Sequence, residues 1–181
     1  MPKDPNIDFL SIIKEVFSSV FNDYGFVLND KAGWDGRGEN TITASKGDID
    51  INFYIGISQL FYYCSAGIKL SGEIGERATA HAKYRSMGIS AIAKGMDPNY
   101  KSNNRGAQTA EEVKKAFEEE RDDMIKYCKD ILLGDVSSWS PIANQLADDW
   151  NKKQNSVNNK QKPEEKSDSV MTKLSKLFGK K

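Results

Sequence analysis

Residues 49–70 read IDINFYIGISQLFYYCSAGIKL, and this stretch decides the fold. Apolar side chains alternate with polar or small ones from Ile49 to Ile57, and the alternation returns from Leu60 to Leu70. A period of two places the apolar side chains on one face of a strand and the others on the opposite face. The short connection between the two runs therefore predicts an antiparallel hairpin with one buried face.

The residues before this hairpin predict more strands of the same sheet. Asn40–Ala44 reads as a strand, Lys46 and Gly47 as the turn that follows it, and a short strand begins at Phe26. The segment Asn29–Glu39 holds three glycines, which predicts a loop rather than a regular element. We therefore expect an antiparallel meander of three to four strands.

Helical periodicity flanks the meander on both sides. Apolar residues recur at intervals of three and four from Ile7 to Tyr24, and Gly25 is expected to end that helix. A capping box of Thr109 and Glu112 predicts the start of a long helix that reaches Leu133.

Two further segments complete the expected architecture. Glu73–Met96 fits both periods, and its alanines favour a helix. Ser140 followed by Pro141 is typical of a helix start, which predicts a last helix through Trp150. The expected fold class is α+β, with an N-terminal helix, the antiparallel meander, C-terminal helices packed on one face, and a disordered basic tail.

Charge divides the chain although its total is zero. Residues 152–181 hold nine Lys and three acidic residues, a net charge of +6, so residues 1–151 carry −6. Asn, Gln, Lys and Ser dominate the tail as far as Ser169, a composition that buries little apolar surface and predicts disorder. Residues 170–178 regain a short amphipathic pattern. We expect an acidic globular domain over 1–151 and a flexible basic tail over 152–181.

No motif in the sequence predicts catalysis. His81 has no nucleophile at a recognisable spacing, and with Cys64 and Cys128 it does not form the short pattern of a zinc site. Asp48, Asp50 and Asn52 alternate along one strand face, which could hold a hard cation or be a solvated polar face. The acid that a metal nuclease would place two residues before Lys69 is Gly67. The expectation is no catalytic residue, no cofactor and no metal.

Three places are candidates for contact with a partner. The glycine-rich segment offers a tryptophan that either anchors a partner or folds back onto the sheet, and the long helix carries a run of acids. The amphipathic part of the tail suits an anionic membrane, a nucleic acid, or solubility alone. The first two candidates comprise Trp34, Asp35, Arg37, Glu39, Glu118, Glu119, Glu120, Asp122 and Asp123. The third comprises Lys173, Leu174, Lys176, Leu177, Phe178, Lys180 and Lys181.

The order of elements over residues 7–70, a helix ending in Gly25 and Phe26 followed by the meander, resembles the small α+β immunity proteins of bacterial toxin systems and related bacterial or phage domains. The resemblance implies a protein-binding module whose acidic surface covers a basic partner. The alternatives are a peripheral membrane or scaffold protein that docks through its tail, and a hydrolase with an unrecognised site. With two cysteines and no signal peptide, we expect a cytoplasmic location, or a peripheral one at the inner face of the membrane.

Overall fold

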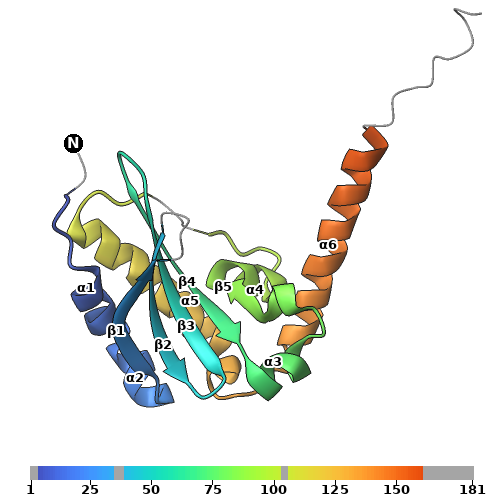
Figure 1. Cartoon of the computed structure of the whole chain (residues 1–181), viewed down its shortest axis with the longest axis horizontal. Coiled ribbons are helices and arrows are strands. Elements are labelled where there is room, and N and C mark those ends of the chain that lie inside the picture. The colour runs from blue at the N-terminus through green and yellow to red at the C-terminus, as the bar shows by residue number, and fades with distance from the viewer. Residues whose placement is uncertain (1–3, 35–38, 103–105, 161–181) are drawn as a thin grey trace, which may run out of the picture. The chain divides into compact units, whose positions relative to one another are not determined.

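The computed structural model describes the backbone of residues 4–34, 39–102 and 106–160, and side chains over 4–29, 41–102 and 106–152. It confirms the α+β class (Figure 1). Contacts divide the chain at Gln145, and the site described below lies wholly before that point. The elements are α1 (Phe9–Val16), α2 (Ser18–Tyr24), β1 (Val27–Trp34), β2 (Glu39–Lys46), β3 (Ile49–Ile57), β4 (Tyr62–Leu70), α3 (Gly72–Ala78), the 3-10 helix η1 (Ala82–Arg85), β5 (Ser86–Gly88), α4 (Ile89–Met96), α5 (Ala110–Leu132) and α6 (Trp139–Lys160).

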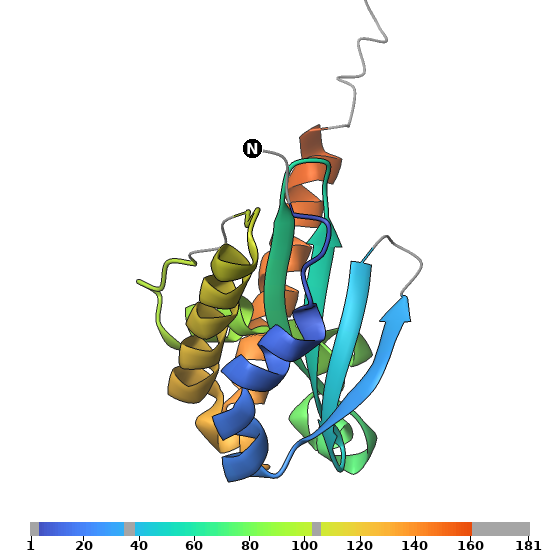
Figure 2. The same ribbon diagram turned by 90° about the vertical axis from the view of Figure 1, so that its left-hand side faces the viewer.

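The five strands form one antiparallel sheet in the order β1-β2-β3-β4-β5. The predicted hairpin pairs Ile51 with Ile68, Phe53 with Ala66 and Ile55 with Cys64. All six of these residues are buried, so one face of β3 and β4 carries the core, as the period of two predicts. The β3–β4 hairpin rises beyond the ends of β1 and β2 in both Figure 1 and Figure 2.

The prediction of a loop over Asn29–Glu39 is wrong for its first half. β1 runs through this segment to Trp34, and Gly33 pairs with Thr41 of β2. The register shifts between Asn29 and Gly33. Pairing with β2 outweighs the weak strand propensity of glycine because an edge strand tolerates a bulge.

The core lies between the sheet and the helices α1, α2 and α5, which cover the same face in Figure 2. Phe17, Phe53 and Phe117 are fully buried and come from α1–α2, β3 and α5. The ring centroids of Phe17 and Phe53 lie 4.7 Å apart, and Phe117 lies 6.2 Å from each. Each such pair stabilises the fold by roughly 0.5–1.5 kcal/mol, in addition to the stabilisation that comes from burying the rings.

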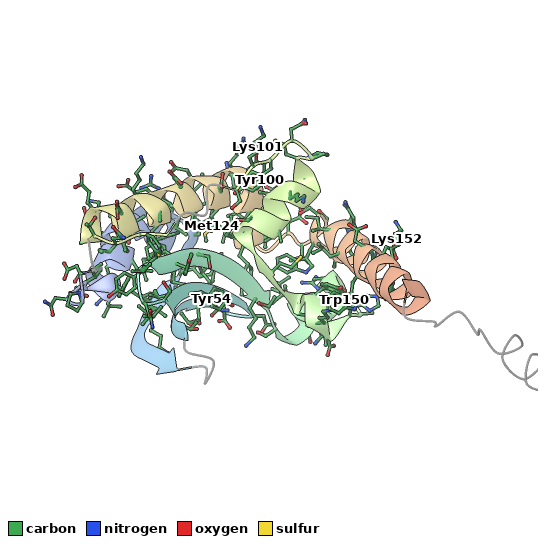
Figure 3. The ribbon with its side chains drawn as sticks, turned by 90° about the horizontal axis from the view of Figure 1, so that it is seen from above. Tyr54, Tyr100, Lys101, Met124, Trp150 and Lys152 are labelled. Carbon is green, nitrogen blue, oxygen red and sulfur yellow. The ribbon has the colours of Figure 1, made fainter. Side chains whose placement is uncertain are left out.

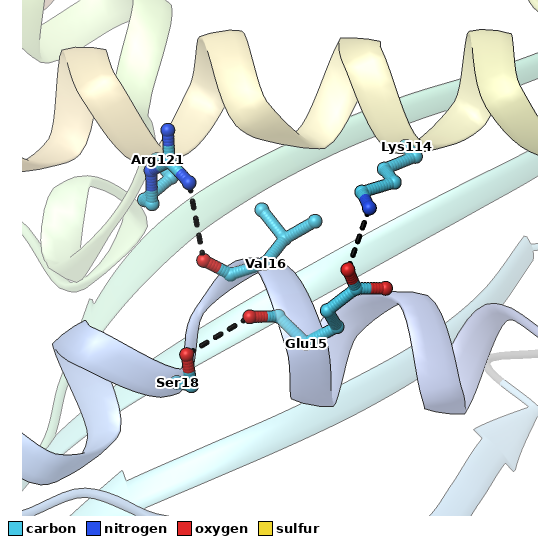
Figure 4. A network of polar contacts seen from close by, with 5 residues as sticks. All are labelled: Glu15, Val16, Ser18, Lys114 and Arg121. Carbon is cyan, nitrogen blue, oxygen red and sulfur yellow. Dashed lines mark hydrogen bonds and ion pairs between the residues drawn. The ribbon is translucent and has the colours of Figure 1, made fainter.

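The predicted helix from Ile7 to Tyr24 forms as two helices that meet at Phe17. The Ser18 hydroxyl donates a hydrogen bond to the carbonyl of Glu15 at 2.9 Å, a contact that bends helices (Figure 4). α5 holds the bend, because Lys114 binds the Glu15 carboxylate at 2.6 Å and Arg121 donates to the carbonyl of Val16 at 3.5 Å. Gly25 ends α2 with a φ of 74°, as predicted.

The segment Glu73–Met96 is only partly the predicted helix. α3 and α4 are helical, but η1 and the short strand β5 lie between them. Ser86, Met87 and Gly88 pair with β4, and Met87 is buried beside Ile68. These three residues form a strand because they pair with the free edge of β4. This long-range pairing outweighs the helix propensity of the nearby alanines, from which the sequence predicts a helix.

The last helix runs further than predicted. α6 continues to Lys160, so the residues directly after Trp150 are helical rather than linker. Starting a helix is the costly step, so a helix that has already started is extended at little cost by Lys and Gln, and its extension tolerates the weaker helix former Asn. Residues 161–181, which hold the rest of the predicted tail, lie outside the described residues.

Candidate functional site

The sheet has a second face, opposite the core, that no described helix of residues 4–145 covers. The side chains on it are the alternate residues of each strand, and Tyr54 lies on the side of the sheet away from α5 in Figure 3. Asp50 and Lys69 are directly opposite each other and supply the charge of this face on β3 and β4. Its other positions on the three central strands are Glu39, Thr41, Thr43, Ser45, Asn52, Tyr54, Gly56, Tyr63, Ser65 and Gly67. We call this surface the open face.

The polar residues at one end of the open face satisfy one another. Ser45 donates a hydrogen bond to the Asp50 carboxylate at 2.7 Å, and Thr43 donates to the amide oxygen of Asn52 at 2.9 Å. Within the described residues no group of three or more His, Cys, Asp or Glu side chains is placed to hold a metal ion. Cross-strand hydrogen bonds therefore account for Asp50 and Asn52, two of the three side chains that the sequence offered as cation ligands.

The opposite end of the open face contains a hollow of about 570 Å³. It lies where β3 and β4 pass the end of β5 and the first turn of α4. Its walls combine two tyrosines with two serines, while glycine and alanine make up the remainder. The lining residues are Tyr54, Gly56, Tyr63, Ser65, Ala66, Gly88, Ser90 and Ala91. We call this feature the tyrosine hollow.

Two glycines beside the tyrosine hollow differ in whether the structure leaves room for a side chain. A Cβ on Gly67 would lie 3.0 Å from the Met87 carbonyl oxygen and 3.3 Å from the Tyr54 ring, tighter than most Cβ contacts, so packing favours glycine there. A Cβ on Gly88 would have only the Ala66 carbonyl oxygen nearby, at 3.8 Å, and the φ of Gly88 is −66°. Neither packing nor backbone conformation demands glycine at 88, and its bare backbone keeps the hollow open.

The tip of the β3–β4 hairpin, next to the hollow in the chain, carries exposed apolar side chains, of which Tyr63 lies on the open face and Ile57 follows the opposite face. Ile57 and Tyr63 are each 48 % exposed and Leu60 is 58 % exposed. Between Asp50 and Lys69 the sequence has 18 residues without an Asp, Glu, Lys or Arg, in a chain where such residues make up 29 %. Apolar side chains that gather at an exposed projection mark an interaction site more often than isolated ones do.

A group of acids lies behind the hollow, at the contact of α5 with β4. The Glu120 carboxylate accepts a hydrogen bond from the backbone N–H of Ala66 at 3.1 Å. Burial raises the pKa of Glu120 to about 7, and the charges of Asp123 and Glu119 act in the same direction. Tyr100 donates to the Asp123 carboxylate at 2.6 Å, and burial together with this bond raises the pKa of Tyr100 to about 12.

The acids that the sequence places in one run on the long helix do not form one surface. Glu120 and Asp123 turn inward to β4 and to Tyr100. Asp122 is exposed and binds the Arg121 guanidinium at 2.7 Å. Glu118 and Glu119 are half-buried on the same helix. A helix turns 100° at each residue, so five nearly consecutive acids spread around its axis.

The other predicted contact residues are only partly described. Trp34 is the last residue of β1 and Glu39 the first of β2, and their side chains lie outside the described residues. Asp35 and Arg37 lie outside the described residues altogether, as do all the tail residues from Lys173 to Lys181.

The candidate reactive side chains occupy structural positions. Cys64 and Cys128 are free and buried, and burial raises the pKa of each thiol to about 12. Such a thiol stays protonated and packs as a small hydrophobe. His81 is exposed, with its ring 6.3 Å from that of Tyr84.

Sequence reasoning passed over the tyrosine hollow, although one signal for it was present. The residues between the buried positions of β3 and β4 include Tyr54, Gly56, Tyr63 and Ser65, in the uncharged run from Ile51 to Ile68. The contributions of Gly88 and Ser90 had no such signal, because they depend on β5 pairing with β4.

Comparison of this chain with protein-family models, with curated proteins and with solved structures finds no match. Among the described helices, none combines the length and the apolar character that a bilayer crossing requires. The geometry of the open face therefore carries the functional argument by itself.

Proposed function

We propose that this chain is a non-enzymatic protein-binding module whose partner contacts the open face at the tyrosine hollow and the hairpin tip. The observation that carries the proposal is that an open hollow, Tyr54 and Tyr63, and an exposed apolar tip all belong to the stretch of β3 and β4 that has no Asp, Glu, Lys or Arg. The sequence also predicts a binding module, but with its contact surface on the acids of α5 instead of on the sheet.

Composition supports this choice of surface. The centres of protein interfaces are depleted of charged side chains and enriched in tyrosine, which offers a large contact area with few rotatable bonds. Serine and glycine beside the tyrosines add hydrogen-bonding groups and close access to the backbone. The tyrosine and serine hydroxyls are the polar groups among the described side chains of the lining, and such groups donate and accept hydrogen bonds.

The partner surface should be uncharged where it meets the hollow. A charged side chain placed there would lose its hydration, and no described side chain of the lining carries an opposite charge to offset the loss. A basic toxin or nuclease held by acidic side chains is the competing form of the same function. The two forms differ in how binding responds to salt.

Photo-crosslinking in the producing cells tests the proposal. Tyr63 is replaced by p-benzoylphenylalanine, and a matched variant carries the same group at Glu119 of α5. We expect one discrete protein adduct from position 63 and none from position 119. With the captured partner purified, Tyr63→Ala should weaken binding about fivefold or more, as expected of a tyrosine at an interface centre.

Salt separates the two forms of the function. Raising the NaCl concentration tenfold should change the dissociation constant by no more than about twofold if the contact is uncharged. An adduct from position 119 instead, with affinity that falls steeply in salt, would transfer the function to the acidic helix. No adduct from either position would remove the protein-binding proposal.

A further inference from the structure

We infer that the tyrosine hollow is a socket for one uncharged apolar side chain of the partner together with its flanking main chain. This inference rests on the proposed function and names what the hollow accepts. The first observation is at Gly88, where a Cβ would fit and packing does not require glycine.

The size and the shape of the hollow fit this occupant. A volume of about 570 Å³ exceeds what a single side chain fills, so main chain on either side of it can enter as well. Gly56 and Gly88 present bare backbone on two sides of the hollow, which allows another chain to approach closely. The rings of Tyr54 and Tyr63 provide the apolar walls.

The polar groups around the hollow suit main chain rather than a charged side chain. The hydroxyls of Tyr54, Tyr63 and Ser65 can each donate and accept hydrogen bonds, as peptide N–H and C=O groups require. Among the described side chains, the lining holds no lysine, arginine, aspartate or glutamate. The Glu120 carboxylate lies close to the hollow as well, and it accepts a hydrogen bond from the backbone N–H of the lining residue Ala66.

The position of Ser90 is fixed by contacts outside the hollow. Tyr100 forms side-chain hydrogen bonds with both Ser90 and Asp123, and the Ser90 and Ser102 hydroxyl oxygens lie 3.4 Å apart. The wall that α4 contributes is therefore held to α5 through side chains. A socket held in place before binding costs less conformational entropy when it is filled.

Titration of the intact chain with short peptides tests the socket directly. The probes are acetyl-Ala-Leu-Ala-amide and acetyl-Ala-Lys-Ala-amide, and the readout is the set of backbone amide shifts in a nitrogen-15 NMR spectrum. We expect saturable millimolar binding of the leucine peptide, with shifts at Ser65, Gly88 and Ser90, and at least tenfold weaker binding of the lysine peptide.

Gly88→Gln is the decisive variant because it fills the hollow at a position where a Cβ fits. Ser86→Gln is its matched control, since Ser86 is exposed on the same strand and the same face but does not line the hollow. We expect Gly88→Gln to weaken the leucine peptide at least tenfold and Ser86→Gln to leave it unchanged. If Gly88→Gln does not fold, Tyr63→Ala replaces it and should weaken the leucine peptide severalfold.

Three results would overturn the socket. These are equal binding of the leucine peptide by Gly88→Gln and Ser86→Gln, equal binding of the leucine and lysine peptides, and the absence of saturable shifts near Ser65. Any of these results leaves the proposed function standing if position 63 still crosslinks to a partner, which would then lie across the face without entering the hollow. A socket that binds the leucine peptide in a chain that gives no crosslink would sink the proposed function alone.

Discussion

At the scale of single residues, Glu120 is the most unusual side chain of the described structure. Its carboxylate is buried against β4, and the nearby acids Asp123 and Glu119 raise its pKa further. The hydrogen bond from the Ala66 N–H favours the ionised form but does not offset the burial, because the pKa still rises from 4.5 to about 7. Glu120 therefore couples the proton concentration to the contact between α5 and the strand that lines the hollow.

The sign of this coupling gives a prediction for Glu120→Gln. Between pH 4.5 and about 7 the folded protein holds a proton that the unfolded chain releases, so its free energy of unfolding falls as pH rises. Glutamine keeps the acceptor for the Ala66 N–H and cannot ionise. At pH 8 the variant should be more stable than the wild type by up to about 3 kcal/mol, and at pH 4 the two should be close.

Urea unfolding at pH 4, 6 and 8 measures the effect, and Glu111→Gln, at an exposed position of the same helix, is the control. If the wild type and Glu120→Gln lose stability in parallel between pH 4 and 8, Glu120 does not carry the coupling.

At the scale of elements, α5 is the helix that contacts both α1 and β4. It begins with a complete capping box, in which the Thr109 hydroxyl accepts from the Glu112 N–H and the Glu112 carboxylate accepts from the N–H groups of Thr109 and Gln108. It then contacts α1 through Lys114 and β4 through Glu120. The start of this helix sets where both contacts fall along the sheet.

Thr109→Ala should therefore lower the free energy of unfolding by about 1 kcal/mol, because the Glu112 N–H loses its acceptor. Thermal or urea unfolding measures the change. Ser19→Ala, at an exposed position inside α2, is the matched control and should shift stability by less than about 0.5 kcal/mol. Equal effects of the two variants would show that the box does not stabilise α5.

At the scale of the whole molecule, a body with a net charge of −6 is joined to a tail with +6. The open face takes little part in this division, since Asp50 and Lys69 lie opposite each other on it. We expect the tail to provide a second, electrostatic means of contact. Each lysine held near an anionic lipid surface contributes about 1 kcal/mol.

We therefore expect the intact chain to co-sediment weakly with vesicles that contain anionic lipid, and to be released by 0.5 M NaCl, a concentration at which charges more than about 4 Å apart are screened. Replacing Lys173, Lys176, Lys180 and Lys181 by Gln should abolish the binding. The matched control replaces the exposed Lys69, Lys94, Lys101 and Lys115 by Gln and should retain it. Equal loss in the two variants would show that the tail has no particular role.

The sequence by itself determined the α+β class, the β3–β4 hairpin, the end of α2 at Gly25 and the capping box of α5. Each follows from interactions between residues close together in the chain, namely side-chain alternation, a left-handed glycine, and a cap three residues from its partner. Only the tertiary structure decided the bend at Phe17, the strand character of Ser86–Gly88, the burial of Glu120 and the tyrosine hollow. These depend on which strand edge is free and which helix lies against it, and such long-range pairings outweigh the local preferences that a sequence displays.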